Sequence, residues 1–573
     1  MKQRETGKRK KENGTREIRK GKGGRSGMKR AVAAAVVAVP IAVSLFSQNP
    51  AGTSVESPWH NVSSLEFIYD LTYMRDGERV YEQSILEEEL ELIREAREFI
   101  VADMFLFNDE YDRSKGQYPK ISERLADALL EKKAQNPKMP IVLITDPINN
   151  FYGAYLDDNL ARLREGGVQV VVTDLNKLKD SNFLYSGYYR FFLKWFGTEG
   201  RGWITNPFDP DGPEVNIRSL LKLANFKANH RKLLVTEREG LVASANPHDA
   251  SGRHSNVAVR VDGGVLGEMA EAESVVAAFS GLPLPERLLK QKGLFVQAGP
   301  PSGGPPSAGT PSEGPPSVGA PSEGAPSAGA PSAGTPSAGT PSEGAPSEGT
   351  PSEGAPSAGT PSEADPFGEG PGDYPALPGA KVRYLTEEGI FNGLMERINA
   401  AGQGDEIQIG IFYIADTALV KGLEEAAKRG AQIKIVADPN KDAFGMEKDG
   451  SPNRIVLSDL KKKSGDIQIR WYDTHGEQYH TKMAYFSFPD KDVTILGSCN
   501  YTRRNLRGLN LESDLEVVTA KNSDFSKDVA DYFERIWNNR DGEYTLDFSA
   551  YEETSPLKRI QYWIQEPTGL CTY

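Results

Sequence analysis

The feature that most constrains the fold is an internal duplication, because one series of strand-like and helix-like segments occurs twice in the same order. In both copies, runs rich in β-branched and aromatic residues alternate with helical runs, which is typical of an α/β sheet with buried strands. The sequence therefore predicts an α/β fold made of two similar halves. The matching segments are Glu98–Phe107 and Glu406–Ala415, Ile141–Pro147 and Ile433–Pro439, Val168–Thr173 and Ile467–Tyr472, Asn256–Val261 and Asp514–Thr519, and Gly264–Ser280 and Asn522–Asn538.

A segment of different composition separates the two copies. From Gly299 to Glu363 a Gly-x-Pro-Ser-x pentad repeats, and this period of five excludes the period of three of collagen. Such a composition cannot bury a core and predicts a disordered linker. Because doubling the length of a loop costs only about 0.6 kcal/mol, the linker does not prevent the halves from packing together. We expect a first half at 60–290, a linker at 299–373 and a second half at 374–573.

The N-terminus has the pattern of a targeting segment. Residues 1–30 form a basic tail, and an apolar segment at 31–47, interrupted by Pro40, follows it. This segment is shorter than the roughly 20 residues that usually span a bilayer. It predicts either a secretory signal or a membrane anchor, and the basic flank predicts an exported body. Whether the segment is cleaved stays open.

Charge and cysteine content narrow the possible partners. The whole chain carries a formal charge of −13 although its first 30 residues are strongly basic, so the body is acidic. Nucleic-acid affinity depends largely on Lys and Arg against phosphates, which argues against nucleic acid as the partner. Cys499 and Cys571 lie far apart in the sequence and imply no disulfide framework.

Each copy contains one His-x-Lys motif followed by one Ser-x-Asn motif. Side chains two residues apart in a strand point to the same face, so each motif offers an imidazole beside an ammonium. With two imidazoles in one site, one can attack an electrophilic phosphorus while the other protonates the leaving alcohol. Lysines and amides can hold the non-bridging oxygens, and this chemistry requires no metal or cofactor. The candidate catalytic residues are His230, Lys232 and Asn246 in the first copy, and His480, Lys482 and Asn500 in the second.

These motifs resemble those of the phospholipase D superfamily, whose mark is a duplicated H-x-K-x4-D sequence followed by G-S-x-N. The resemblance covers both copies and implies two α/β/α sandwich halves packed as a pseudo-dimer, with a phosphohistidine intermediate. By this resemblance His230 is the nucleophile and His480 the general acid and base. The chain departs from the pattern where Glu237 and Ser487 replace the aspartates and Ala243 replaces a glycine.

The family also places an acidic residue near each histidine to orient it. Glu512, in the sequence N-L-E-S-D, occupies that place in the second half and is added to the catalytic residues. Asn256 stands at the matching place in the first half, which leaves the orientation of His230 open. Ser244, Ser498 and His248 are the expected substrate-binding residues.

The aromatic segment Phe183–Gly197 suits either a membrane surface or a helix packed in the core. In the first case Tyr188, Tyr189 and Trp195 are the expected membrane contacts. The leading hypothesis is a monomeric hydrolase or transferase of the cardiolipin synthase and phospholipase D-like branch, which acts on phospholipids with water or an alcohol as acceptor. The alternatives are an exported, metal-independent nuclease of the same superfamily and a catalytically inactive binding relative.

Overall fold

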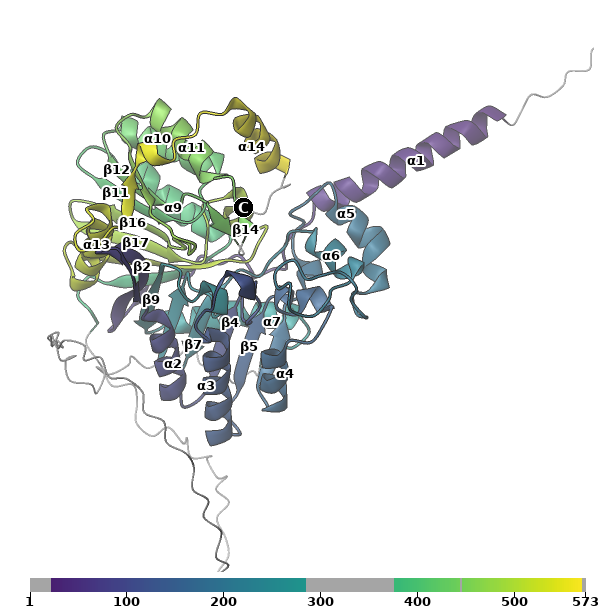
Figure 1. Ribbon diagram of the computed structural model, residues 1–573, viewed down its shortest axis with the longest axis horizontal. Helices are drawn as coiled ribbons and strands as arrows, with labels where there is room; N and C mark the ends of the chain where they lie inside the picture. The colour runs from purple at the N-terminus through teal and green to yellow at the C-terminus, as the bar shows by residue number, and fades with distance from the viewer. Residues whose placement is uncertain (1–21, 285–375, 444–445, 569–573) are drawn as a thin grey trace, which may run out of the picture. The chain divides into compact units, whose positions relative to one another are not determined.

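The computed structural model describes residues 22–284, 376–443 and 446–568. Most of the predicted basic tail and the whole predicted linker at 299–373 lie outside the described residues. Within the described residues the chain forms two large sheets with helices, so the predicted α/β class is confirmed (Figure 1).

The first sheet has eight strands in the order β3-β2-β9-β8-β7-β4-β5-β6. Strands β4, β5 and β6 are parallel, and their neighbours run antiparallel. Every residue of β4, β5, β7, β8 and β9 is buried, which explains their continuous apolar sequences. The strands are β2 (Leu65–Arg75), β3 (Glu78–Glu82), β4 (Ile100–Met104), β5 (Ile141–Thr145), β6 (Gln169–Val172), β7 (Lys232–Thr236), β8 (Glu239–Ala243) and β9 (Asn256–Asp262).

The second sheet repeats this arrangement. Its order is β1-β10-β18-β17-β16-β11-β12-β15-β19, so β10 to β15 along the sheet correspond to β2 to β6 in the first. The parallel part again comprises three strands, β11, β12 and β15. The strands are β1 (His60–Asn61), β10 (Lys381–Thr386), β11 (Glu406–Ile411), β12 (Gln432–Ala437), β15 (Gln468–Tyr472), β16 (Lys482–Ser487), β17 (Lys491–Gly497), β18 (Ser513–Ala520) and β19 (Thr545–Asp547).

The sequence did not predict the outer strands of the first sheet. The β2–β3 hairpin extends that sheet, and the carboxylate of Asp70 in β2 accepts hydrogen bonds from the backbone N–H groups of Ser84 and Ile85. It thereby caps the N-terminus of α2 (Ile85–Glu95). Strand β1 crosses to the edge of the second sheet, where it pairs with β10.

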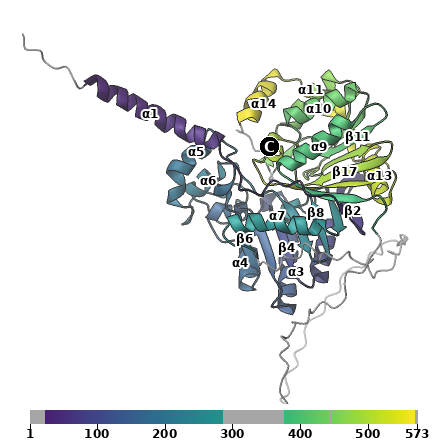
Figure 2. The same ribbon diagram turned by 180° about the vertical axis from the view of Figure 1, so that it is seen from behind.

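The remaining helices cover the faces of the sheets. Helices α2, α3 and α4 pack beside one another on the first half, and α9, α10 and α11 do so on the second (Figures 1 and 2). Their bounds are α3 (Ile121–Gln135), α4 (Asp158–Glu165), α9 (Glu388–Ala400), α10 (Thr417–Lys428) and α11 (Asn453–Lys463), with α12 (Arg503–Leu506) and α14 (Pro556–Thr568) near the C-terminus.

The two halves share one hydrophobic core. Helix α7 (Val265–Phe279) contacts β4 and β7 of its own half and β10 of the other. Helix α13 (Asp524–Trp537) correspondingly contacts β17 and β2. The aromatic rings of Phe67 and Tyr532, from different halves, meet at 5.4 Å inside this core. The predicted packing of the halves against each other is therefore present.

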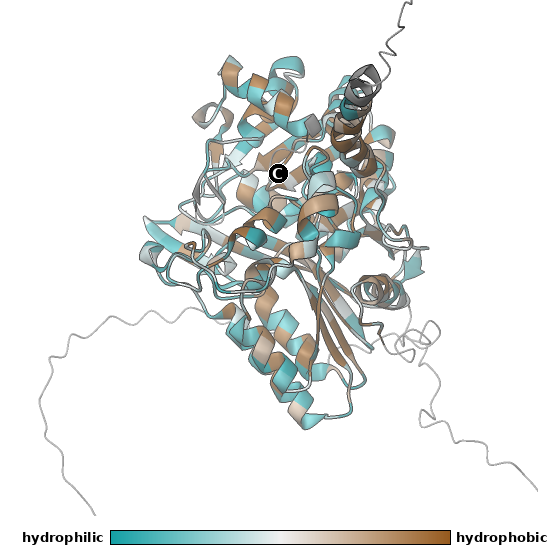
Figure 3. Cartoon of the chain, turned by 90° about the vertical axis from the view of Figure 1, so that its right-hand side faces the viewer, coloured by the Kyte–Doolittle hydropathy of each residue, from teal (hydrophilic) through white to brown (hydrophobic). Residues whose placement is uncertain are grey.

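The N-terminal apolar segment forms the helix α1 (Lys22–Leu45), whose residues Met28–Leu45 are long and apolar enough to cross a membrane. Most of this stretch is exposed and apolar, as the brown colour of the helix in Figure 3 shows. Its last turns contact α5 (Ser186–Tyr188), so the helix ends against the body.

Candidate active site

The two motif histidines lie in equivalent places, just before β7 and β16, and the backbone of each pairs with the opposite half. The N–H of His230 donates to the carbonyl oxygen of Leu511 at 2.8 Å. The N–H of His480 donates to the carbonyl oxygen of Ser255, also at 2.8 Å. Glu512 follows Leu511 in the sequence, and Asn256 follows Ser255. The backbone pairing therefore holds His230 beside Glu512 and His480 beside Asn256.

Those two residues orient the imidazoles across the halves. His230 Nδ1 lies 2.9 Å from Glu512 Oε2, and His480 Nδ1 lies 3.2 Å from Asn256 Oδ1. The sequence left the orientation of His230 open and assigned Glu512 to the histidine of its own half, His480. The second expectation is wrong, because Glu512 contacts His230. The carboxylate serves His230, and His480 receives an uncharged amide oxygen.

The two motif serines support these orienting residues. Ser498 Oγ donates to Glu512 Oε2 at 2.6 Å, and Ser244 Oγ donates to Asn256 Oδ1 at 3.1 Å. Both hydroxyl protons are therefore used inside the protein, and the structure places these serines as positioning residues rather than as substrate donors.

The two motif lysines are buried in matching environments. Lys232 Nζ donates to the carbonyl oxygen of His230 and Lys482 Nζ to that of His480, each at 2.6 Å. The rings of Phe105 and Phe412 lie 5.0 and 5.1 Å from the two ammonium groups. Each ammonium keeps further N–H groups, so both can still bind an anion.

The amides of Asn246 and Asn500 are buried, and their Oδ1 atoms have no hydrogen-bond partner among the described residues. Buried amides are normally satisfied within a folded protein. An amide oxygen accepts hydrogen bonds, so these two equivalent Oδ1 atoms are available to a donor on a ligand, such as a hydroxyl group.

Burial and like charges shift the ionisation of this cluster. Burial, and then the ammoniums of Lys232 and Lys482, hold the pKa of His230 well below its usual value. Burial lowers the pKa of Lys232 to about 7 and raises that of Glu512 to about 7. The pKa of His480 is also held well below its usual value by burial and then by Lys482. An anion bound here would relieve the repulsion among these cations.

His248 does not face the site. Its Nδ1 lies 2.9 Å from Ser251 Oγ and its Nε2 lies 2.8 Å from the carbonyl oxygen of Glu110, so both ring nitrogens are engaged elsewhere. The ring of His254 instead lies 5.8 Å from the ring of His480. The sequence analysis selected His248 as a substrate-binding residue and did not select His254, which is the histidine that lies next to His480.

Two buried aspartates were also missed. Asp146 Oδ2 accepts from the N–H of Asn229 at 2.7 Å, and Asp438 Oδ2 accepts from the N–H of Tyr479 at 2.8 Å. Both fix the residue immediately before a motif histidine. The signal was present in the sequence, because both copies contain Asp-Pro after a β-strand.

The departures from the motif lie away from the imidazoles. Glu237 follows the far end of β7 and accepts from the N–H groups of Arg97 and Glu98. Ser487 ends β16 and donates to Asp492 at 3.1 Å. Glu237 holds the segment that precedes β4 and Ser487 holds the β16–β17 turn, so their change from aspartate does not remove a group from the histidine cluster.

The structure divides the predicted membrane contacts. Trp195 is 74% exposed, Tyr188 is partly buried with its hydroxyl donating to the carbonyl oxygen of Val37, and Tyr189 is only 7% exposed. Tyr189 is thus packed inside the protein and cannot contact a membrane surface. Other exposed aromatic side chains of the segment are Phe191, Phe192 and Phe196.

Among the residues that the structure describes, no group of three or more His, Cys, Asp or Glu side chains is arranged to hold a metal ion. The expectation of metal-free chemistry stays a prediction.

Comparisons with known proteins place the second half in a family. Residues 394–537 match the family model described as "Cardiolipin synthase, PLD-like domain". No curated protein sequence matches the chain significantly.

Several solved structures are similar to the chain. Phosphatidylserine synthase from Haemophilus influenzae Rd KW20 is 10% identical, with a TM-score of 0.46 over 90% of this chain and 96% of that one. Nuc from Salmonella typhimurium, described as a phospholipase D family member, is 17% identical, with a TM-score of 0.22 over 29% and 97%. NucT from Helicobacter pylori is 15% identical, with a TM-score of 0.22 over 28% and 99%.

Proposed function

Because the chain belongs to the phospholipase D superfamily, we propose that it cleaves or transfers phosphodiesters of phospholipids through a phosphohistidine intermediate. The observation that carries this proposal is the hydrogen bond of 2.9 Å between His230 and Glu512, which come from different halves. A carboxylate that accepts from Nδ1–H leaves Nε2 with a free lone pair, and this is the arrangement a nucleophilic imidazole needs.

In the first step Nε2 of His230 attacks phosphorus, a P–N bond forms and the P–O bond to the leaving alcohol breaks. His480, protonated once the anionic substrate is bound, gives its Nε2 proton to that alcohol. The ring of His230 becomes positively charged as it bonds to phosphorus, and Glu512 stabilises it. Lys232 and Lys482 hold the non-bridging oxygens, where negative charge is concentrated.

In the second step neutral His480 takes a proton from water or from an acceptor alcohol, and the resulting oxygen nucleophile attacks phosphorus. The P–N bond breaks and His230 is regenerated. Water as acceptor gives hydrolysis, and an alcohol gives transfer of the phosphatidyl group. Either acceptor uses the same residues.

Phospholipid is the proposed substrate because the half of the chain that carries His230 also carries a surface suited to membrane contact. Helix α1 ends against the body beside exposed aromatic side chains, which include Phe192 and Trp195. Tyr and Trp favour the membrane–water boundary. We infer an exported body held at the membrane by an uncleaved α1, since residues that follow the helix bind the body. Asn49, for example, accepts from the N–H of Lys179 and donates to the carbonyl oxygen of Gly508.

Trapping of the intermediate tests the proposal. The full chain in nanodiscs is mixed with phosphatidylglycerol labelled at phosphorus and quenched, and protein-bound label is located by mass spectrometry. We expect label on His230 in the wild type, none in H230A, and slow formation in H480A. His475 lies outside the cluster and pairs with Asp473, so H475A is the matched control and should behave as wild type.

Failure to trap label, together with no head-group release by the wild type, would refute the catalytic proposal and favour a binding relative. Degradation of plasmid DNA without added metal, abolished by H230A, would instead favour the nuclease alternative.

A further inference from the structure

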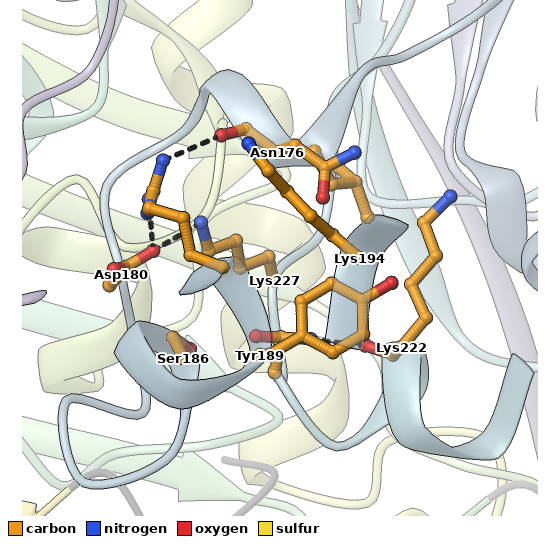
Figure 4. A pocket seen from close by; sticks show the side chains of 10 residues that line it. Asn176, Asp180, Ser186, Tyr189, Lys194, Lys222 and Lys227 are labelled. Atoms are coloured by element: carbon orange, nitrogen blue, oxygen red, sulfur yellow. Dashed lines mark hydrogen bonds and ion pairs between the residues drawn. The ribbon is translucent and has the colours of Figure 1, made fainter. Parts of the chain in front are cut away.

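A cavity lies apart from the motif residues, in the insertion between β6 and β7. Residues of α5, of the π-helical segment Tyr189–Leu193 and of α6 (Ile217–Leu223) line it, and α5 contacts α1. Its empty volume is about 370 Å³, including the part open to solvent. None of its lining residues belongs to the His-x-Lys or Ser-x-Asn motifs. Figure 4 shows the side chains that line it, which are Leu175, Asn176, Asp180, Ser186, Tyr189, Arg190, Lys194, Lys222, Asn225 and Lys227.

The cavity has an excess of positive charge in an otherwise acidic protein. Four cationic side chains line it, against the single carboxylate of Asp180. That carboxylate is already shared, because its Oδ1 lies 2.6 Å from Arg190 Nη2 and 2.5 Å from Lys227 Nζ. Its Oδ2 accepts from the hydroxyl of Ser44 in α1 at 2.9 Å. The other two cations, Lys194 and Lys222, form no ion pair with Asp180.

Lys222 is the most informative of these cations. Among the described residues no side chain or carbonyl oxygen accepts a hydrogen bond from its ammonium, although the residue is partly buried. Burial lowers its pKa, with Asp174 and Asp146 acting weakly in the opposite direction. A partly buried ammonium without an acceptor is costly unless a bound anion completes it.

Two further donors are unsatisfied at the same cavity. The hydroxyl of Ser186, a residue only 1% exposed, has no hydrogen-bond partner, and neither has Nε of Arg190. Native proteins leave few buried polar atoms unpaired. The hydroxyl of Ser186, the Nε–H of Arg190 and the ammonium of Lys222 lack acceptors, although the other nitrogens of Arg190 are paired with Asp180 and Asn176. These three donors match a ligand that carries several acceptor oxygens, such as a phosphate group.

The cavity also lies at the membrane end of the protein. Gly187, the residue after Ser186, is so close to α1 that a Cβ atom there would lie 2.0 Å from the carbonyl oxygen of Pro40. The exposed rings of Phe191 and Trp195 follow in the same segment. If α1 crosses the bilayer, this segment lies at the level of the lipid headgroups, where phosphates are concentrated.

We propose that this cavity binds the phosphate group of an anionic phospholipid as a second, non-catalytic site. Such a lipid joins α1 to the body and fixes the orientation of the body on the membrane. The proposal goes beyond the catalytic function, because it assigns a ligand to residues that take no part in the chemistry at His230.

The test measures protection of Lys222 and Lys194 from acetylation, read by mass spectrometry on the full chain in nanodiscs. All samples carry H230A, so that lipid turnover does not confuse the result. One arm uses phosphatidylcholine alone, a second adds phosphatidylglycerol, and a third adds inorganic phosphate to the phosphatidylcholine discs. Exposed Lys421, on α10, is the internal control.

We expect phosphatidylglycerol to slow the acetylation of Lys222 about tenfold when its concentration is ten times the dissociation constant, with no change at Lys421. S186A should abolish most of this protection without lowering Tm, because the hydroxyl it removes has no partner in the free protein. K222Q should show the same loss of protection at Lys194.

Equal acetylation with and without phosphatidylglycerol would overturn the proposal. Protection by inorganic phosphate but not by phosphatidylglycerol would assign the cavity to a soluble anion and overturn the lipid source. Head-group release is also measured for S186A in a chain that keeps His230. If S186A loses the protection of Lys222 but still releases head groups, the cavity and the catalytic residues are separate sites and the catalytic proposal stands. Retained protection in H230A with no turnover in the wild type would refute only the catalytic proposal.

Discussion

Replacement of Glu512 by glutamine, E512Q, tests the hydrogen bond that connects the halves at the candidate active site. The carboxylate accepts from His230 Nδ1 at 2.9 Å, from Ser498 Oγ at 2.6 Å and from the amide of Asn505. Glutamine keeps the shape and one acceptor oxygen but removes the negative charge. That charge matters most when the ring of His230 is bonded to phosphorus and positively charged.

The magnitude follows from the loss of a hydrogen bond to a charged group, which contributes about 1.5–3 kcal/mol. Because about 1.36 kcal/mol corresponds to a factor of ten, kcat should fall about 10- to 100-fold. KM should change little, since the free imidazole of His230 is uncharged. Burial raises the pKa of Glu512 in the free protein to about 7, so kcat/KM of the wild type should fall as the pH drops through about 7. E512Q should lack this acidic limb.

The assay is head-group release from phosphatidylglycerol by the full chain in nanodiscs, with Tm measured for each variant. E388Q is the matched control, because Glu388 is a partly buried residue on α9 whose ion pair with Lys179 lies outside the cluster. Wild-type kcat and an unchanged pH profile in E512Q, with H230A inactive, would refute the assigned role of this carboxylate.

Other regions give independent predictions. R231M should lower Tm by the equivalent of about 3–5 kcal/mol, because it leaves the buried carboxylates of Glu273 and Glu387 without the cation that lies 2.9 Å from each; an unchanged Tm would contradict this. Burial raises the pKa of Glu89 from 4.5 to about 8. Between these pH values the folded protein keeps a proton that the unfolded chain has released, so the free energy of unfolding should fall as the pH rises. E89Q should therefore be more stable than the wild type at pH 8 by about 4 kcal/mol and gain little near pH 4.5. Equal gains in thermal unfolding at both pH values would disprove the assignment. Because burial holds the pKa of His480 well below its usual value while the site is empty, binding of sulfate, which does not itself titrate near neutral pH, should be accompanied by net proton uptake. Calorimetry in buffers of different ionisation enthalpy would detect this uptake, and heats that do not depend on the buffer would exclude it.

Much of the fold is encoded locally. The predicted segment Ile141–Pro147 contains β5, and the predicted segment Gly264–Ser280 contains α7. Hydrophobic periodicity reports these elements because it depends only on near neighbours. The outer hairpin β2–β3 was missed, since β3 is largely exposed and polar residues such as Glu66 and Asp70 interrupt the apolar run of β2.

The sequence by itself also determined which residue types form the site, because the His-x-Lys and Ser-x-Asn motifs occur in both copies. Only the tertiary structure decided their partners. Glu512 follows the second motif along the chain and yet orients His230, which is 282 residues away. His248 and Tyr189 looked available in the sequence, but packing occupies the first and buries the second. Hydrogen bonding and burial depend on which distant segments meet, and a local pattern of residues does not contain that information.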